Sequence, residues 1–526
     1  MRCLFARHLS LITVFMSSQL LRTKSIDKLL ADADRPGRQL RKSLGPWSLT
    51  ALGIGAIIGT GIFILTGTAA AGEVLQVHSI WKAPLLDLIL HGGSALGTAG
   101  RPGAGPAIAL SFLLVALVCA LAGLCYAELA SMIPIAGSAY TYTYATLGEI
   151  VAWIIGWDLI LEYAVSNMAV AVGFSAYVDS LLQSFGLRLP REFMEPMFVG
   201  GQRTGAWFNL PGFLIVMVIT VVLVIGIRES AGANNFMVTV KIIAILVFVF
   251  AASRYVNTSN WKPFMPNGWQ GVLTGGAIVF FTYIGFDSVS TAAEECRKPQ
   301  RDVPIGIIAS LIICAVLYVS VAIVLTGVQH WDTLRNAAPV ANALKAIGLE
   351  SVQRWVTVGA LTGMISSLLV FQLGQARVWF AMSRDGLLPR AFSKVHPRFR
   401  TPHISTWAAG FFVAIPSGIF DIGTLADLSN IGTLFAFLLV SLGVLVLRHK
   451  QPERRRSFRT PWVPVVPILA IGCCLVLMAS LPLETWGRFL VWLAIGLTIY
   501  FSYSKKRSEF GSAPRRDPSE AVAPPT

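Results

Sequence analysis

Four ionisable residues lie deep within apolar stretches of this chain. Asp158 and Glu162 stand one helical turn apart, Asp287 follows a glycine-containing run, and Lys241 interrupts another apolar run. Charge at such depth in a bilayer is costly, so these residues usually face a polar path and help to move a proton, an ion or a polar solute. The pattern predicts proton-coupling or gating roles for Lys241, Glu162, Asp287 and Asp158.

Each of these residues also has a structural explanation. Glu162 is deep enough to favour a functional role, but it can be a satisfied buried carboxyl group. Asp158 can share a proton with Glu162 or line a polar path on the same face. Asp287 can cap a helix that restarts after it, and Lys241 can extend its amine to the membrane surface. Glu128, near the end of an apolar run, is more consistent with a structural role.

The segment Gly53–Phe63 contains four glycines and a threonine within a run apolar enough to span a bilayer. Backbone groups released at membrane depth must be satisfied by protein, water or a ligand, so a broken helix indicates a substrate site. A close helix contact is the alternative, because Gly55 and Gly59 form a small-xxx-small pair. The run Gly275–Asp287 again combines glycines and hydroxyl groups at mid-span. Two discontinuous helices are therefore expected.

Composition defines the class of protein that must position these residues. The chain has 526 residues, of which 55% are hydrophobic and only 13% charged, and its mean hydropathy is +0.66. These values predict an all-α integral membrane protein. Apolar spans of about 20 residues predict twelve transmembrane helices, near residues 48–72, 106–130, 146–178, 210–227, 236–253, 270–293, 304–328, 354–383, 403–420, 425–447, 463–481 and 485–503.

The two interrupted helices are the first and the sixth, which predicts an inverted repeat of five plus five helices whose broken segments meet at the substrate. The expected divisions are a cytoplasmic N-terminal segment (1–45), a first repeat (46–255), a second repeat (256–448), helices eleven and twelve (449–504), and a disordered cytoplasmic tail (505–526).

Most of the 42 lysines and arginines fall on one side of this topology. Basic residues favour cytoplasmic loops, so both termini are expected inside, in a multi-pass membrane protein. The net charge of +15 then reflects orientation and contact with anionic lipid. Because the basic residues are scattered over short loops, they do not indicate a nucleic-acid partner.

Several other classes of function lack support in the sequence. Residues 1–20 resemble a signal peptide only superficially, because seven basic residues follow and no cleavage site stands out. The seven cysteines indicate neither disulfides nor a metal site, and no cofactor is expected. No phosphate loop or nucleophile elbow suggests an enzyme.

Nine segments, in order from about residue 40 to 505, resemble the cationic amino acid transporter family. They are Gly53–Gly67, Cys125–Glu128, Pro134, Ala136–Tyr142, Gly156–Tyr163, Gly285–Glu295, Arg301–Ile307, Met382–Pro389 and Asn430–Leu434. The family belongs to the amino acid–polyamine–organocation (APC) superfamily, and the chain resembles its twelve-helix bacterial form. The resemblance implies a fold of the leucine-transporter type and transport of L-amino acids.

The resemblance also implies a binding site at the two breaks. The substrate carboxylate is expected on the backbone N–H groups of Gly59, Thr60 and Gly61, where a half-helix offers unpaired donors. The substrate ammonium is expected on the carbonyl groups of Ile57, Phe281 and Ile284. Lys241 matches a family lysine whose ammonium substitutes for a sodium ion, which favours proton coupling. Glu162 and Asp287 match family carboxylates near the side chain and in proton coupling.

Two features bear on the substrate. Phe371 stands where bacterial relatives can carry a slimmer methionine, so a smaller pocket favours small and medium neutral amino acids over arginine. Against this, Glu162 can attract a cationic side chain. The connection of residues 73–105, with Trp81, Asp87 and His91, is longer than in compact relatives and is expected to modify access from outside.

Proton-coupled uptake by alternating access is the function that the sequence favours. An amino acid exchanger and a transporter of arginine or lysine remain alternatives, and a non-transporting amino acid sensor is a remote one, because the tail leaves little room for a signalling module. The expected partners are the amino acid, a proton and membrane lipids, and the presence of a small accessory membrane subunit is left open.

Overall fold

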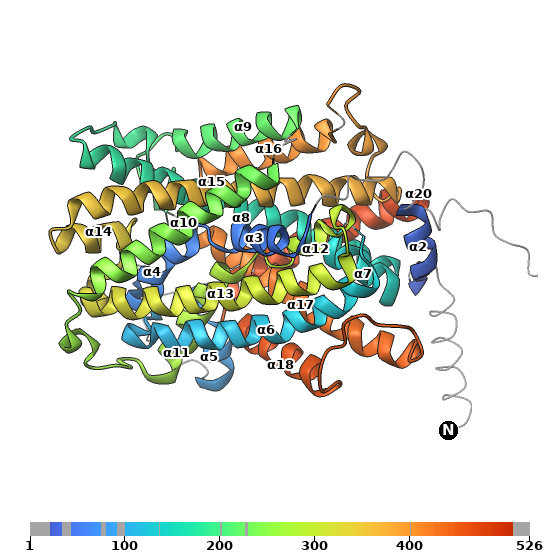
Figure 1. Ribbon diagram of the computed structural model, residues 1–526, viewed down its shortest axis with the longest axis horizontal. Coiled ribbons are helices and arrows are strands. Elements are labelled where there is room, and N and C mark those ends of the chain that lie inside the picture. Colours follow the sequence, from blue (N-terminus) through green and yellow to red (C-terminus); the bar gives the residue numbers. More distant parts are fainter. Residues whose placement is uncertain are drawn as a thin grey trace, which may run out of the picture.

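The computed structural model describes residues 21–33, 44–74, 80–91, 100–135, 137–199, 202–226, 230–399 and 401–508. These residues form one bundle of helices that run roughly side by side (Figure 1). The expectations for residues 1–20 and for the tail beyond residue 508 lie outside the described residues. So do parts of the 73–105 connection.

A helix occupies each of the twelve predicted ranges. These helices are α3 (Pro46–Ile57) continued by the π-helix η2 (Gly61–Leu65) and α4 (Thr66–Ala71), α6 (Ile108–Met132), α8 (Glu149–Ser184), α9 (Leu210–Ile225), α10 (Ser230–Ser253), α11 (Gly268–Val279), α13 (Pro299–Val328), α15 (Glu350–Arg384), α16 (His403–Ser417), α17 (Ile422–Lys450), α18 (Val465–Ala479) and α19 (Leu483–Ile499). Shorter helices are α2 (Ile26–Ala33), α5 (Leu85–His91), α7 (Ser138–Thr146), α12 (Ser288–Thr291), α14 (Pro339–Ala346) and α20 (Lys505–Arg507).

Among the described residues, seven helical stretches are long and apolar enough to cross a membrane, counting Gly268–Thr291 (α11 to α12) as one, or eight if the bent pair α3 and α4 counts as one span. The most apolar stretch of α8 is 89% buried within the protein, whereas that of α10 is only 33% buried. An apolar helix that is covered on all sides belongs to the centre of a bundle, and one with an uncovered apolar face lies against lipid. The chain is therefore a multi-pass membrane protein with α8 at its centre.

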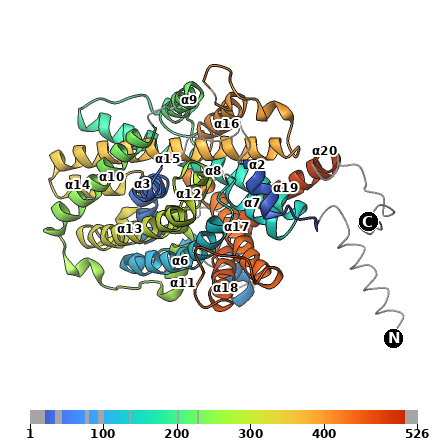
Figure 2. The same cartoon turned by 45° about the vertical axis from the view of Figure 1, so that its right-hand side comes forward.

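Packing around α8 divides the bundle into recognisable layers. Helix α8 packs against α15 and α17, while α13 packs against α3 and α6. Helices α9 and α16 lie side by side on one outer face, and α18 lies on the opposite side, in both views (Figures 1 and 2). The short α2 and α20 gather at one end of the bundle (Figure 1). We call this the basic end, because it also carries the arginine-rich segment that follows α17.

Ion pairs fasten the basic end. Arg448 of α17 donates two hydrogen bonds to the Glu128 carboxylate, at 2.8 and 2.9 Å, and the backbone amide of Thr460 donates a third at 2.8 Å. Glu128 thus joins α6 to α17 and to the following loop, in agreement with a structural role. Lys24 lies 3.0 Å from Asp385, which ties the segment before α2 to the end of α15.

The opposite end holds the described part of the 73–105 connection. Strand β1 (Gly72–Val74) pairs antiparallel with β2 (Gly100–Pro102), while a second small pair, β3 (Phe198–Val199) with β4 (Gln202–Arg203), lies elsewhere. The segment before α5 pairs with the α18–α19 turn through the Leu483 amide and the Ala83 carbonyl, 3.0 Å apart. The connection thus rests on the last two long helices.

Candidate functional site

The first break separates α3 from η2 at residues 58–60. Ile58 leaves the helical conformation with ψ of 89°, and the two arms of the broken span meet at an angle of 42°. Glycine is required here by close packing, because a Cβ atom on Gly59 would lie 2.9 Å from the Ser367 hydroxyl oxygen. Residues 58–60 therefore form a short interruption between α3 and η2, buried in the centre of the bundle.

The second break follows α11. The chain tightens into a 3₁₀ turn over Phe280–Tyr283, becomes extended at Ile284 and reaches φ of +113° at Gly285 before α12. Residues that carry a side chain rarely adopt that φ, and a Cβ atom on Gly285 would also lie 2.8 Å from the Ala56 Cβ. Glycine is therefore needed twice over, for its backbone conformation and for the close approach of α3.

The two breaks lie against each other, as the sequence predicted for discontinuous helices. A Cβ atom on Gly61 would lie 2.6 Å from the Thr282 methyl carbon, so the first break is in van der Waals contact with the second. The Tyr318 hydroxyl of α13 lies 2.9 Å from both the Ile57 and the Thr282 carbonyl oxygens. One phenol thus bridges the ends of the two broken helices.

Lys241 is completely buried and does not extend to the membrane surface. Its ammonium donates to the carbonyl oxygens of Gly55, at 2.8 Å, and Ile58, at 2.9 Å. The Ser367 hydroxyl of α15 lies 2.9 and 3.1 Å from the same two oxygens. A cation and a hydroxyl group therefore satisfy the carbonyl groups that α3 releases where it ends, as buried backbone acceptors require.

Asp287 does not cap α12, so that structural alternative is wrong: it occupies the N-cap position, but its side chain makes no capping hydrogen bond. Its carboxylate instead accepts a 2.8 Å hydrogen bond from the Tyr163 hydroxyl of α8. The Ser138 hydroxyl lies at the longer distance of 3.5 Å. Asp287 thus ties the second break to the central helix.

Glu162 and Asp158 are buried on α8, and neither carboxyl group has a hydrogen-bond partner among the described residues. One oxygen of Asp287 is unpartnered in the same sense. Glu162 interacts electrostatically with both aspartates. The structure therefore gathers the three predicted carboxyl groups into one region, while Lys241 contacts the first break at the Gly55 and Ile58 carbonyl groups.

Phe371 of α15 lies between the central helix α8 and the second break. It is 3% exposed, its ring centroid is 6.2 Å from that of Tyr163, and its Cζ atom would lie 3.3 Å from a Cβ atom on Gly285. Its ring therefore fills space between α8 and the second break.

The remaining predicted residues lie at the breaks themselves. The Phe281 carbonyl accepts from the Ile284 amide at 3.3 Å. The Thr60 hydroxyl is buried without a partner among the described residues. The Thr60 methyl group occupies the space that a side chain on Gly173 of α8 would need. Small size at Gly173 is thus needed to seat the first break on α8.

Three contributors escaped the sequence analysis: Tyr318, Ser367 and Tyr163. Each carries one hydroxyl group within an apolar helix, where such residues are common. The carbonyl that Tyr318 reaches in α3 is 261 residues away along the chain. The only signal for Tyr318 is a phenol at mid-span, which needs a partner when it is buried.

The chain matches the amino acid permease family over residues 44–501. It is 47% identical over 496 residues to the branched-chain amino acid permease BcaP of Bacillus subtilis (strain 168), covering 94% of this chain and 99% of that protein. It is 45% identical over 491 residues to the methylthioribose transporter of the same bacterium, covering 93% and 99%. A vacuolar cationic amino acid transporter of Arabidopsis thaliana is 36% identical over 444 residues, covering 83% of this chain and 68% of that protein.

This chain belongs to the amino acid permease family. The resemblance to the cationic amino acid transporters and the APC superfamily is thereby confirmed. Family and fold together define a multi-pass membrane protein of the secondary transporter class, with two broken helices at its centre.

Proposed function

We propose that this protein takes up neutral L-amino acids together with a proton across a bacterial inner membrane, by alternating access. It performs no chemical conversion of the substrate. The observation that carries the proposal is the meeting of two broken helices in a buried centre, bridged by Tyr318 and held from one side by Lys241. Such a centre is typical of carriers that bind a solute at mid-membrane.

An amino acid zwitterion suits the backbone groups of the breaks. Its carboxylate would accept from the amide groups of residues 59–61, at the start of a half-helix with a favourable dipole. The Gly59 amide donates to the Ile57 carbonyl at 3.0 Å in the structure and would exchange that acceptor for the carboxylate. Its ammonium would donate to the carbonyl groups of Ile57, Phe281 and Ile284. The Ile57 carbonyl already accepts from Tyr318, so an arriving ammonium would share or replace that hydrogen bond. Substrate binding would then loosen the bridge between the breaks.

Lys241 and the carboxyl groups supply two places for a coupled proton. Loss of the Lys241 proton would remove the positive charge that faces the Gly55 and Ile58 carbonyl groups and would weaken the hold on the end of α3. Glu162 is buried without a hydrogen-bond partner among the described residues, and a change in its charge would act strongly on neighbouring Asp287. Either site would link protonation to the shape of a break.

Neutral side chains of small or medium size are the proposed substrates. Phe371 occupies volume beside the second break, which disfavours a long cationic side chain. Relatives named branched-chain amino acid permeases, in Bacillus subtilis and in Lactococcus lactis at 32% identity, support this choice. Glu162 supports the alternative of a cationic substrate, as do the plant relatives by name.

Methylthioribose is a second candidate substrate, because a relative named for it is nearly as similar as the amino acid permease. That sugar carries neither a carboxylate nor an ammonium group. It would leave the half-helix donors and the freed carbonyl groups without charged partners, which disfavours it at this site. Competition between the two solutes would distinguish them directly.

The topology is part of the proposal. Residues 46–255 and 256–448 would form the two inverted repeats, residues 449–504 would form helices eleven and twelve, and the basic end with both termini would face the cytoplasm. In this arrangement the 73–105 connection lies outside the cell. Labelling of a single cysteine introduced at exposed Ser457 by an impermeant reagent, in whole cells and in inverted vesicles, would test the orientation.

The transport proposal is tested in proteoliposomes loaded with the purified protein. We expect isoleucine uptake to depend on an inward proton gradient, to collapse with a protonophore and to be competed by alanine but weakly by arginine or methylthioribose. Lys241→Ala and Glu162→Gln should both abolish the response to the gradient. Uptake that is independent of the proton gradient but requires amino acid loaded inside the liposomes would instead identify an exchanger. Strong competition by methylthioribose would overturn the assigned substrate.

A further inference from the structure

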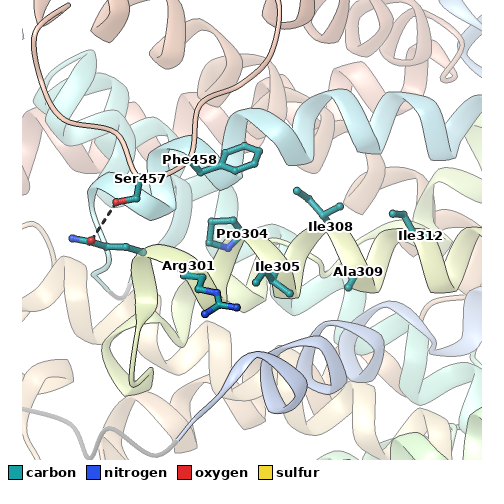
Figure 3. A pocket seen from close by; sticks show the side chains of 9 residues that line it. Arg301, Pro304, Ile305, Ile308, Ala309, Ile312, Ser457 and Phe458 are labelled. Carbon is teal, nitrogen blue, oxygen red and sulfur yellow. Dashed lines mark hydrogen bonds between the residues drawn. The ribbon is translucent and has the colours of Figure 1, made fainter.

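A groove of about 530 Å³ lies on the outside of the bundle, and none of the residues that line it belongs to either break. Its floor is the first half of α13, and its wall is the loop between α17 and α18 (Figure 3). Phe458 of that loop extends over the helix, so the loop and the helix enclose the groove together. The groove opens toward the space that lipid would fill, since Ile305 and Ile312 are 40% and 59% exposed.

The two ends of the groove differ in polarity. Gln300, Arg301 and Ser457 lie at the basic end. The lining then continues along one face of α13 through Ile305, Ile308 and Ile312 without a polar side chain.

The length of the apolar lining matches one membrane leaflet. From Pro304 to Ile312 the apolar lining rises about 12 Å at 1.5 Å per residue. That rise is close to the roughly 15 Å of one leaflet, half of the roughly 30 Å hydrocarbon core of a bilayer. The groove therefore has a polar entrance at the membrane surface and an apolar channel of one leaflet's depth.

The polar end is suited to an anion. Arg301 is the one charged residue that lines the groove, it is exposed, and no ion pair engages it among the described residues. Gln300 accepts a 3.2 Å hydrogen bond from the Ser457 hydroxyl through its carbonyl oxygen, which leaves the amide N–H groups of its side chain as donors. Exposed Arg297 and Lys298 precede this site in the chain and add to its positive charge.

We propose that this groove binds an anionic phospholipid of the cytoplasmic leaflet. The phosphate lies on Arg301 and on the side-chain amide of Gln300, and one acyl chain lies along α13 beneath Phe458. A helix of a partner protein fits less well, because the groove combines a single cationic end with an apolar length of one leaflet rather than a full span. The inner side of α13 carries Tyr318, so the lipid would rest on the helix that bridges the two breaks.

Native mass spectrometry of the delipidated protein, with added phosphatidylglycerol or phosphatidylethanolamine, tests the proposal. One basic residue near a charged membrane surface contributes about 1 kcal/mol, so Arg301→Gln should weaken phosphatidylglycerol binding about fivefold. The matched control is Arg390→Gln, which removes the same charge from an exposed position of the 390–393 turn that does not line the groove. It should leave the affinity within about twofold of the parent.

A second pair of variants tests the apolar channel separately. Ala309→Trp fills the groove and should weaken both lipids, whereas Val316→Trp, on an exposed part of α13 that does not line it, should not. Equal effects of the two arginine variants would overturn the proposal in favour of diffuse attraction. So would undiminished binding in Ala309→Trp, equal binding of both lipids by the parent, or a copurified small protein that Ala309→Trp displaces. None of these readings depends on the transport assay.

Discussion

Tyr318 is the residue whose removal tests the arrangement of the two breaks most sharply. In Tyr318→Phe the ring stays, and only the hydroxyl group that lies 2.9 Å from the Ile57 and Thr282 carbonyl oxygens is lost. The hydroxyl has one proton, so it donates one full hydrogen bond or two shared ones. The Ile57 oxygen retains the Gly59 amide as a second donor at 3.0 Å. The change therefore leaves one buried acceptor poorly satisfied.

An unsatisfied buried acceptor costs about 1–3 kcal/mol. If that cost falls on the conformation that binds substrate, kcat/KM for isoleucine uptake should fall about five- to 150-fold. The ring still fills its place, packed at 5.1 Å between centroids against Tyr283. We therefore expect the detergent-solubilised variant to remain folded, with only a small decrease in Tm.

Tyr283→Phe is the matched control. It makes the same chemical change to a neighbouring buried tyrosine, whose hydroxyl donates to the Phe112 carbonyl of α6 at 3.2 Å and does not join the two breaks. Uptake by this variant should stay within about threefold of the parent, because only a single long hydrogen bond is lost. Uptake by Tyr318→Phe equal to that of Tyr283→Phe, at similar Tm, would refute the reasoning that the bridge matters for transport.

Three further changes test other parts of the protein. Lys241→Met removes the donor to two freed carbonyl groups, so uptake should fall more than about tenfold, while Lys241→Arg should recover little because its planar fork presents donors differently. Phe371→Met should raise the ratio of arginine to isoleucine uptake by about three- to tenfold if the ring limits the pocket; an unchanged ratio in a competition assay would show that it does not. Burial raises the pKa of Glu73, but the charge of Arg101, 2.7 Å away, more than offsets this and holds the pKa below its ordinary value. The ion pair therefore stabilises the fold at neutral pH and is lost as the pH falls through the lowered pKa. The Tm difference between the parent and Glu73→Gln should shrink as the pH is lowered from about 7 to about 3. A Tm difference that stays constant over this range would contradict the reasoning.

Hydropathy was sufficient to predict where helices lie, but less so where they begin and end. The helix expected from residue 236 begins at Ser230, and that expected to end at residue 178 continues to Ser184. In both cases the additional turns are partly polar, and an apolar window excludes them. The breaks were predictable because glycines within an apolar run are visible in the sequence. Glycine permits both a close approach of two chain segments and unusual backbone angles.

The environment of the ionisable residues was not predictable from local sequence. Lys241 is near enough to a helix start to reach the surface, but packing against α3 and α15 encloses it. Gly363 of α15 is so close that a Cβ atom there would lie 3.2 Å from the lysine side chain. Asp287 stands at an N-cap position, yet its carboxylate accepts a hydrogen bond from the Tyr163 hydroxyl of α8. Such outcomes depend on partners over a hundred residues away, which period and propensity do not encode.

The supports of the two breaks differ, and the difference suggests which contacts change during transport. The end of α3 is held by Lys241 and Ser367, which share the same carbonyl groups, so loss of one donor leaves another in place. Only the Tyr318 hydroxyl is positioned to join one break to the other through a hydrogen bond, among the contacts of the described residues. A substrate ammonium that donates to the Ile57 carbonyl therefore competes with the Tyr318 bridge. It does not compete with the lysine clamp, by which we mean the hydrogen bonds from Lys241 to the Gly55 and Ile58 carbonyl groups. A ligand shifts a conformational equilibrium only through such differential contacts, so we expect the bridge to be the contact that amino acid binding changes, and the clamp to be the one that proton binding changes.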